Sequence, residues 1–190
     1  ENSKKHQQPA TLNVKSNLDK LTLNNMQVFR FNFRHEKNQK ILYLHGGYNT
    51  LQPSPFHWRL LDKLTLNTLH EVVLPIYPKS PDYHYLETFK AIRDVYNQLV
   101  EEVGANNIVM MGDGSGGGLA LSFVQSLIND NQEVPRKLFL LSPLLDATLT
   151  NPNITKTLEE NDILVSRFGV HQLMKSWTND LPLSDARISP

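Results

Sequence analysis

Two glycine-rich clusters, each directly after a short apolar run, could do chemistry with their backbone. The first is His45-Gly46-Gly47-Tyr48, and the second is Gly112-Asp113-Gly114-Ser115-Gly116-Gly117-Gly118. Glycine lets a backbone N–H group come close to another molecule, so such clusters can hold a negatively charged oxygen. A plain tight turn explains the first cluster equally well. The second also contains the hydroxyl of Ser115, which makes that residue a candidate nucleophile.

Four apolar runs and the helices between them would position these clusters. The expected helices cover about 55–66, 83–103 and the stretch from the second cluster to Leu127, and the runs are Ile41–Leu44, Val72–Leu74, Ile108–Met111 and Leu138–Leu141. Strands that are apolar on both faces and alternate with helices indicate a mostly parallel sheet covered on both sides. We therefore predict an α/β fold, a three-layer sandwich with a partial helical cap.

The segment 83–103 carries the clearest helical pattern. Asp82 is placed to cap its start and Gly104 to end it, and its apolar residues recur every three or four positions: Phe89, Ile92, Tyr96, Leu99, Val100 and Val103. Around it we divide the chain into a polar lead-in (1–25), a core (26–143) and a cap or lid segment (144–190). A helix near Val170–Trp177 is expected in the cap.

The composition restricts the class of protein. The chain has 190 residues, which suits one domain, and 19 Lys and Arg balance 19 Asp and Glu. A net charge of zero does not favour binding to nucleic acid. Without cysteine, neither a disulfide nor a thiolate metal site can form. No apolar run reaches the roughly 18 to 20 residues of a membrane span. Compartment and oligomeric state stay open.

The order and spacing of the motifs resemble the hormone-sensitive-lipase-like esterase group of the α/β-hydrolases. The resemblance covers 26–190 and rests on seven segments: the His-Gly-Gly loop, Tyr77-Pro78, the long helix, the second glycine cluster followed by Leu119-Ala120, Leu141-Ser142-Pro143 with Asp146, Asn161-Asp162-Ile163-Leu164, and Arg187-Ile188-Ser189-Pro190. In this group the second cluster is a nucleophile elbow, a sharp strand-to-helix turn.

The resemblance implies a carboxylic ester hydrolase that acts by serine acyl transfer on a small-molecule ester or acyl ligand. Ser115 would attack the ester carbonyl, the backbone N–H groups of Gly46, Gly47 and Gly116 would hold the oxyanion, and His45 would brace the loop. Serine esterases need no cofactor or metal, so none is implied.

The chain departs from the group's pattern at two points. Aligned by its glycines, the elbow has Gly114 at the nucleophile position, with Ser115 one residue later. Ser115 could act from a displaced position, hydrolysis could have been lost, or a serine at 114 could have been replaced. The group's acid and histidine also follow the cap, so the resemblance completes no triad within 1–190. The histidines outside the first cluster are expected to be surface or packing residues: His6, His35, His57, His70, His84 and His171.

Two alternatives remain at this point. Gly112, Gly114 and Gly117 also spell G-x-G-x-x-G after a strand, the pattern that binds the pyrophosphate of a dinucleotide. That interpretation requires an acidic residue at the end of the next strand, and Asp146 comes several residues too late. The other alternative is a catalytically inactive binding protein on a hydrolase scaffold.

Overall fold

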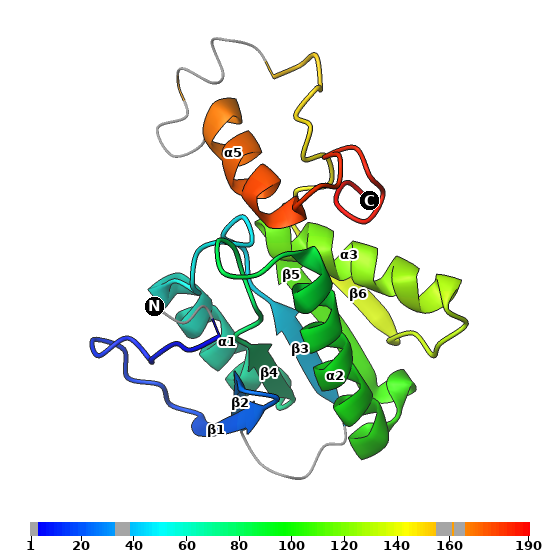
Figure 1. Ribbon diagram of the computed structural model, residues 1–190. Coiled ribbons are helices and arrows are strands. Elements are labelled where there is room, and N and C mark those ends of the chain that lie inside the picture. The colour runs from blue at the N-terminus through cyan, green and yellow to red at the C-terminus, as the bar shows by residue number, and fades with distance from the viewer. Residues whose placement is uncertain (1–3, 33–38, 155–160, 162–165) are drawn as a thin grey trace.

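The computed structural model describes residues 4–32, 39–154, 161 and 166–190 (Figure 1). Its centre is a six-stranded sheet in the order β1-β2-β4-β3-β5-β6. The strands are β1 (Asn17–Leu23), β2 (Met26–Asn32), β3 (Lys40–Leu44), β4 (Glu71–Pro75), β5 (Ile108–Asp113) and β6 (Lys137–Leu141). From β4 to β6 every pairing is parallel, and β1 and β2 join antiparallel. The predicted mostly parallel sheet is confirmed.

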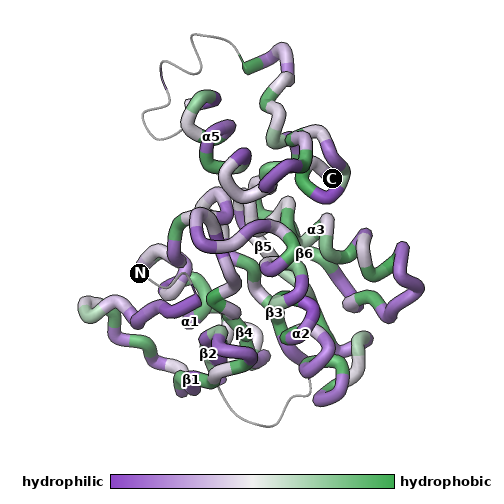
Figure 2. The backbone as a smooth tube through the Cα atoms, viewed as in Figure 1, coloured by the Kyte–Doolittle hydropathy of each residue, from purple (hydrophilic) through white to green (hydrophobic). Residues whose placement is uncertain are grey.

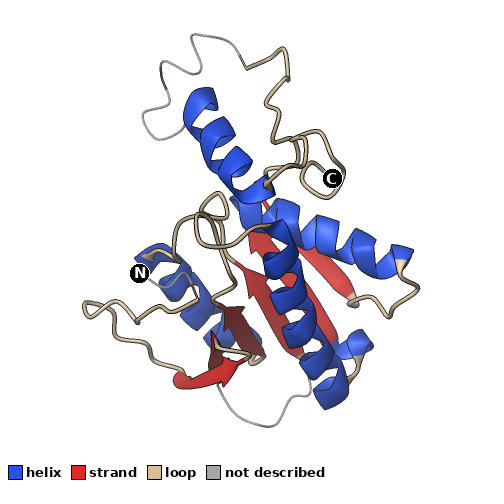
Figure 3. Cartoon of the chain, viewed as in Figure 1, coloured by secondary structure: helices blue, strands red, loops and turns tan. Residues whose placement is uncertain are grey.

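Helices cover both faces of this sheet (Figure 3). They are α1 (Pro55–Thr68), α2 (Tyr85–Val103), α3 (Gly114–Asn129) and α5 (Arg167–Thr178), with a short 3-10 helix at Ala105–Asn107. Alternate residues of a strand point to opposite faces. Accordingly Ile41 and Tyr43 pack with α1 residues, whereas Leu42 and Leu44 pack with residues of α2 and α3. The three-layer sandwich is therefore confirmed.

The last strand differs from the prediction that each strand is buried on both sides. Leu138 and Leu140 of β6 pack against the α2 and α3 layer. On the other side, the side chains of Phe139 and Leu141 are 48% and 40% exposed. The reason is that α1 contacts β2 and β4, at the far side of the sheet from β6. The apolar run thus becomes a strand with only one covered face.

Helix α2 begins and is stabilised differently from the prediction. Its N-cap is His84, and Glu87 accepts a hydrogen bond from the His84 backbone N–H at 3.1 Å. This residue pair, three positions apart, forms a capping box, so the expected cap at Asp82 is wrong. Gly104, at φ 77°, ends the helix as predicted. Polar and apolar residues alternate along α2 in Figure 2, as expected for a helix with one buried face.

We expected regular structure to begin near Met26, but it begins earlier in the chain, with β1. Within the segment expected to be a lead-in, β1 forms a hairpin with β2 around Asn24 and Asn25, whose positive φ angles suit asparagine. Upstream of β1, the buried carboxylate of Asp62 in α1 accepts hydrogen bonds from the backbone N–H groups of Lys15 and Ser16 and from the Ser16 hydroxyl. The hydroxyl bond measures 2.7 Å. These bonds tie the start of the chain to α1.

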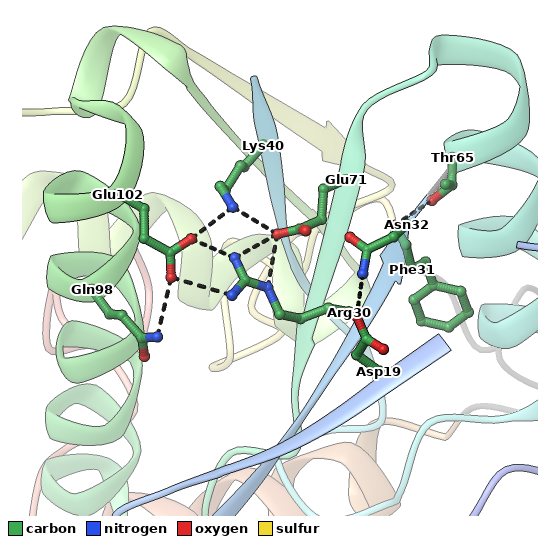
Figure 4. Close-up of polar contacts among 9 residues, drawn as sticks. All are labelled: Asp19, Arg30, Phe31, Asn32, Lys40, Thr65, Glu71, Gln98 and Glu102. Carbon is green, nitrogen blue, oxygen red and sulfur yellow. Dashed lines mark hydrogen bonds and ion pairs between the residues drawn. The ribbon is translucent and has the colours of Figure 1, made fainter. Parts of the chain in front are cut away.

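An ion network joins four elements at the amino ends of β3 and β4 (Figure 4). Lys40 at the start of β3 lies 2.9 Å from Glu71 and 2.6 Å from Glu102 in α2. Arg30 in β2 bonds to the same two carboxylates. Burial alone would raise the pKa of Glu102, but hydrogen bonds from Arg30 and Lys40 lower it to about 2. The network fixes the end of the sheet opposite the glycine clusters.

The segment after β6 folds over the carboxyl ends of the strands (Figure 1). The expected helix near Val170–Trp177 is confirmed as α5, and its buried residues Val170, Met174 and Trp177 join the core. The Trp177 indole N–H donates to the Thr88 hydroxyl of α2 at 2.9 Å. The motif at Asn161–Leu164 lies largely outside the described residues.

Candidate active site

The two glycine clusters meet because β3 and β5 are parallel neighbours. Leu44, the last residue of β3, pairs in register with Gly112, so the loops after both strands leave the same edge of the sheet. The packing between them is tight. A Cβ atom on Gly116 would lie 2.2 Å from the carbonyl oxygen of Leu44, and one on Gly46 would lie 2.5 Å from the Asp113 carboxylate. Only glycine fits at these two positions.

The sharp turn between β5 and α3 has Gly114 at its apex. Gly114 adopts φ 51°, in the left-handed region that favours glycine. A Cβ atom there would have one neighbour within 4 Å, the Cα atom of Gly46 at 3.9 Å, so a side chain at 114 would fit without a clash. Ser115 follows in the first turn of α3. Its side chain is buried, and its Oγ has no hydrogen-bond partner among the described residues.

A cavity of about 350 Å³ opens between the two clusters. The segment after β6 contributes apolar side chains to its wall, and the lining residues are Gly46, Gly47, Tyr48, Asp113, Gly114, Ser115, Ser142, Pro143, Leu144, Leu149 and Val170. A larger cavity of about 480 Å³ lies elsewhere, between α1 and the starts of β5 and β6. It is mostly apolar and contains none of the glycine-cluster residues. We assign the candidate site to the smaller cavity because the groups capable of chemistry surround it.

The carboxylate of Asp113 holds the site together. Its Oδ1 accepts hydrogen bonds from the Tyr43 hydroxyl at 2.8 Å and from the Gly46 N–H at 2.9 Å, and its Oδ2 lies 3.1 Å from Nε2 of His57. Burial alone would raise the pKa of Asp113, but the bonds from His57, Tyr43 and Gly46 hold it below its usual range. Asp113 is also the N-cap residue of α3, yet it makes no capping bond.

The three predicted oxyanion donors occupy different environments. Gly47, at φ 125°, lines the cavity. Gly46 also lines it, but its N–H group already donates to Asp113. Gly116 is buried in the first turn of α3, packed against the end of β3. Their role as donors therefore stays a prediction, and Gly46 would first have to share or exchange its present bond.

His45 is fully buried beneath the first cluster. Its Nδ1 lies 2.7 Å from the Gly46 carbonyl oxygen, and its ring stacks on Tyr77 at 4.7 Å between centroids. Burial, and then the nearby charge of Lys79, lower the pKa of His45 well below its usual range. A neutral ring can donate from Nδ1 to the Gly46 carbonyl. This geometry suits a bracing role for His45, which stays a prediction.

His57 contacts the site through Asp113, and the sequence did not indicate this contact. We expected His57 to be a surface or packing histidine. It occupies the third position of α1, where its Nδ1 accepts a hydrogen bond from the Ser54 N–H at 2.9 Å. The Ser-x-x-His spacing at a helix start was the available signal. His35 lies outside the described residues. Among the described histidines none lines the cavity, and His57 alone bonds to Asp113.

The described residues contain no group of three or more metal-ligating side chains, and none of the described helices is long and apolar enough to cross a bilayer.

Comparison with known proteins identifies related chains. An esterase from Acinetobacter venetianus is 33% identical over 80% of this chain and 50% of its own length. A triacylglycerol lipase from Mycobacterium tuberculosis is 27% identical over 89% of this chain and 34% of its own length. The crystal structure of a candidate esterase from Staphylococcus aureus is 66% identical, with a TM-score of 0.95, over 98% of this chain and 63% of that one.

This chain thus spans about half the length of the first of these relatives and a third of the second. An esterase of the bacterial hormone-sensitive lipase family, 21% identical over 94% of this chain and 61% of its own, has the same fold at a TM-score of 0.85. These likenesses do not favour the dinucleotide-binding alternative. A family model described as the alpha/beta hydrolase fold matches residues 41–190. The chain therefore belongs to the α/β-hydrolase family and resembles its hormone-sensitive-lipase-like esterases and lipases, as its motifs predicted.

Proposed function

We propose that the protein is a carboxylic ester hydrolase that acts by serine acyl transfer on a small ester. One observation carries the proposal: the glycine loop after β3 and the elbow after β5 face each other across a single cavity. The uncapped N-terminus of α3 borders this cavity, and a helix N-terminus stabilises negative charge. An ester carbonyl placed there would develop its negative charge beside backbone N–H groups.

The proposed reaction has two steps. In the first, Oγ of Ser115 attacks the carbonyl carbon, its proton passes to a base, and the carbonyl electron pair becomes an oxyanion held by backbone N–H groups. The oxyanion collapses, the alcohol leaves with a proton, and an acyl-serine ester remains. In the second, water attacks that ester in the same way and releases the acid. In the family that the chain resembles the base and the acid follow the cap, and we assign no residue of 1–190 to either role.

Ser115 is the proposed nucleophile because its hydroxyl is the one nearest the apex of the elbow. Ser115 lines the cavity although it is only 4% exposed. The test is hydrolysis of p-nitrophenyl acetate by the natural protein and by Ser115→Ala. We expect the substitution to remove hydrolysis. Activity that survives unchanged would exclude Ser115.

A second variant separates a displaced nucleophile from an absent one. The apex has room for a side chain, so Gly114→Ser places a hydroxyl where the family pattern has its nucleophile. If the natural protein is inactive and Gly114→Ser hydrolyses the ester, the scaffold is that of a hydrolase without its nucleophile. If both are inactive, the hydrolase proposal fails. Labelling by a fluorophosphonate, followed by peptide mapping, identifies any activated serine directly.

We further propose that residues 144–190 act as a cap that shapes the acyl side of the cavity. Leu149 and Val170 from this segment line the cavity, which supports the proposal. Val170→Ala would enlarge this wall. We expect it to shift the preference from acetyl toward longer acyl esters, measured as the ratio of kcat/KM values for p-nitrophenyl acetate and hexanoate. An unchanged ratio would count against the assignment.

A further inference from the structure

The Asp113 carboxylate connects three segments that are far apart in the sequence. Tyr43 reaches it from β3, Gly46 from the glycine loop, and His57 from the first turn of α1. The Tyr43 hydroxyl and the Gly46 N–H share Oδ1, whereas Oδ2 bonds to His57 alone among the described residues. The orientation of the carboxylate therefore depends on the imidazole.

The hydrogen bonds of His57 define which ring nitrogen carries the proton. Its Nδ1 lies 2.9 Å from the backbone nitrogen of Ser54, which can only donate, and 2.8 Å from the Ser54 hydroxyl. Nδ1 must therefore accept, and the proton of the neutral ring is on Nε2. The Nε2–H group in turn donates to Oδ2 of Asp113, 3.1 Å from Nε2. The lone pair of Nδ1 is bonded to Ser54 and His57 does not line the cavity, so we assign it no role as a general base.

The hydrogen bond from His57 also keeps Asp113 from capping α3. An aspartate at an N-cap position normally accepts hydrogen bonds from the first amides of the helix. Asp113 makes no such bond to α3, because its two oxygens are held by donors from other segments. If Oδ2 were released, the carboxylate could turn and cap α3. It would then occupy the amides that border the cavity and release the Gly46 N–H.

We propose that His57 is a positioning residue: it holds Asp113 in the orientation that fixes the glycine loop and leaves the first turn of α3 open to a ligand oxygen. The inference rests on the proposed ester hydrolysis for its catalytic consequence, but its structural part can be measured without any activity. His57 itself does not line the cavity.

Two substitutions separate this role from helix capping. The amide nitrogen of glutamine can take the place of Nε2, so His57→Gln retains a donor toward Asp113 and loses the acceptor for Ser54. An asparagine amide reaches only as far as Nδ1, so His57→Asn retains the cap on α1 and loses the donor toward Asp113. A positioning role predicts damage in the asparagine variant, and a capping role predicts damage in the glutamine variant. His171→Asn, on α5 and outside the cavity lining, is the matched control.

The first measurement is hydrogen exchange of the Gly46 amide at neutral pH by NMR. We expect exchange at least about 10-fold faster in His57→Asn than in the natural protein, and nearly unchanged in His57→Gln and His171→Asn. The amides at positions 57 and 58, in the first turn of α1, should exchange faster in His57→Gln and at a nearly unchanged rate in His57→Asn. The proposal is overturned if the Gly46 amide exchanges at an unchanged rate in His57→Asn, or if its exchange rate changes in the same variants as those of the α1 amides.

The second measurement is steady-state hydrolysis of p-nitrophenyl acetate. Because a displacement of about 1 Å in the site can reduce turnover about 100-fold, we expect His57→Asn to lower kcat by one to two orders of magnitude with little change in KM. His57→Gln should stay within about 3-fold. If the natural protein hydrolyses no ester, the proposed function fails while the exchange experiment still decides the role of His57. Equal kcat values for both variants contradict positioning.

Discussion

Acidification should destabilise the protein well above the range in which carboxylates titrate, because His45 is buried as a neutral ring. Burial lowers the pKa of His45 in the folded protein, and Lys79 lowers it further. A histidine with a lowered pKa stabilises the fold above its unfolded pKa of 6.5, and this contribution is lost as the pH falls below 6.5. His6 acts in the same direction, because its Nε2 accepts a hydrogen bond from the Trp58 indole N–H and its pKa is also lowered by burial.

The magnitude follows from proton uptake by the unfolded chain. While folded His45 stays neutral, an unfolded histidine with a pKa of 6.5 favours unfolding at pH 5.5 by RT ln 11, about 1.4 kcal/mol. Each further pH unit adds about 1.4 kcal/mol until the folded ring is protonated. His45→Asn removes the contribution of this histidine to the pH dependence of the unfolding free energy. The asparagine amide retains a donor at the Nδ1 position for the Gly46 carbonyl.

Urea unfolding, followed by the fluorescence of the buried Trp58 and Trp177, measures the free energy of unfolding at pH 7.0 and 5.5. Comparing the pH dependence of the natural protein with that of His45→Asn cancels the contributions of other titrating groups. We expect the variant to lose about 1.2 kcal/mol less than the natural protein between these two values. Equal losses in both proteins would refute the reasoning and show that folded His45 can be protonated.

Three further substitutions test features of the fold. Gly116→Ala should destabilise the protein by about 1–3 kcal/mol, seen as a lower melting temperature, because its Cβ would clash with the carbonyl of Leu44; an unchanged melting temperature would mean that the strands can move apart. Glu102→Gln should lower stability by about 1 kcal/mol in low salt and by less in 1 M NaCl, since part of the ion network is exposed to solvent; salt-independence would contradict this. Trp177→Phe should lower the unfolding free energy by about 1 kcal/mol through loss of the bond to Thr88, and no change in urea unfolding would show that this bond is not stabilising.

The sequence pattern predicted those strands that are buried on both faces of the sheet. The runs at 41–44, 72–74 and 108–111 became β3, β4 and β5, because strands in the centre of a parallel sheet have apolar residues on both faces. β1 was not predicted since it lies at the edge of the sheet, where an exposed strand needs no apolar alternation. The exposed face of β6 was also missed, because a strand's composition does not tell which helices reach it.

The candidate site was predictable in its backbone and not in its side-chain contacts. Two glycine clusters after apolar runs indicated where the chain turns, and parallel pairing of β3 and β5 brings them together. Asp113 and His57 are 56 residues apart in sequence. Their contact depends on where the first turn of α1 lies relative to β5, and nothing in the local pattern encodes that distance.

The glycine at the apex of the elbow has an energetic consequence for the whole chain. A residue with a Cβ atom held at φ 51° would store strain of about 1–3 kcal/mol, which the surrounding packing would have to offset. With Gly114 the turn is relaxed, so its geometry does not depend on stabilisation from elsewhere in the fold. Gly114→Ser would therefore exchange stability for reactivity: any hydroxyl gained at the apex should be accompanied by a lower melting temperature.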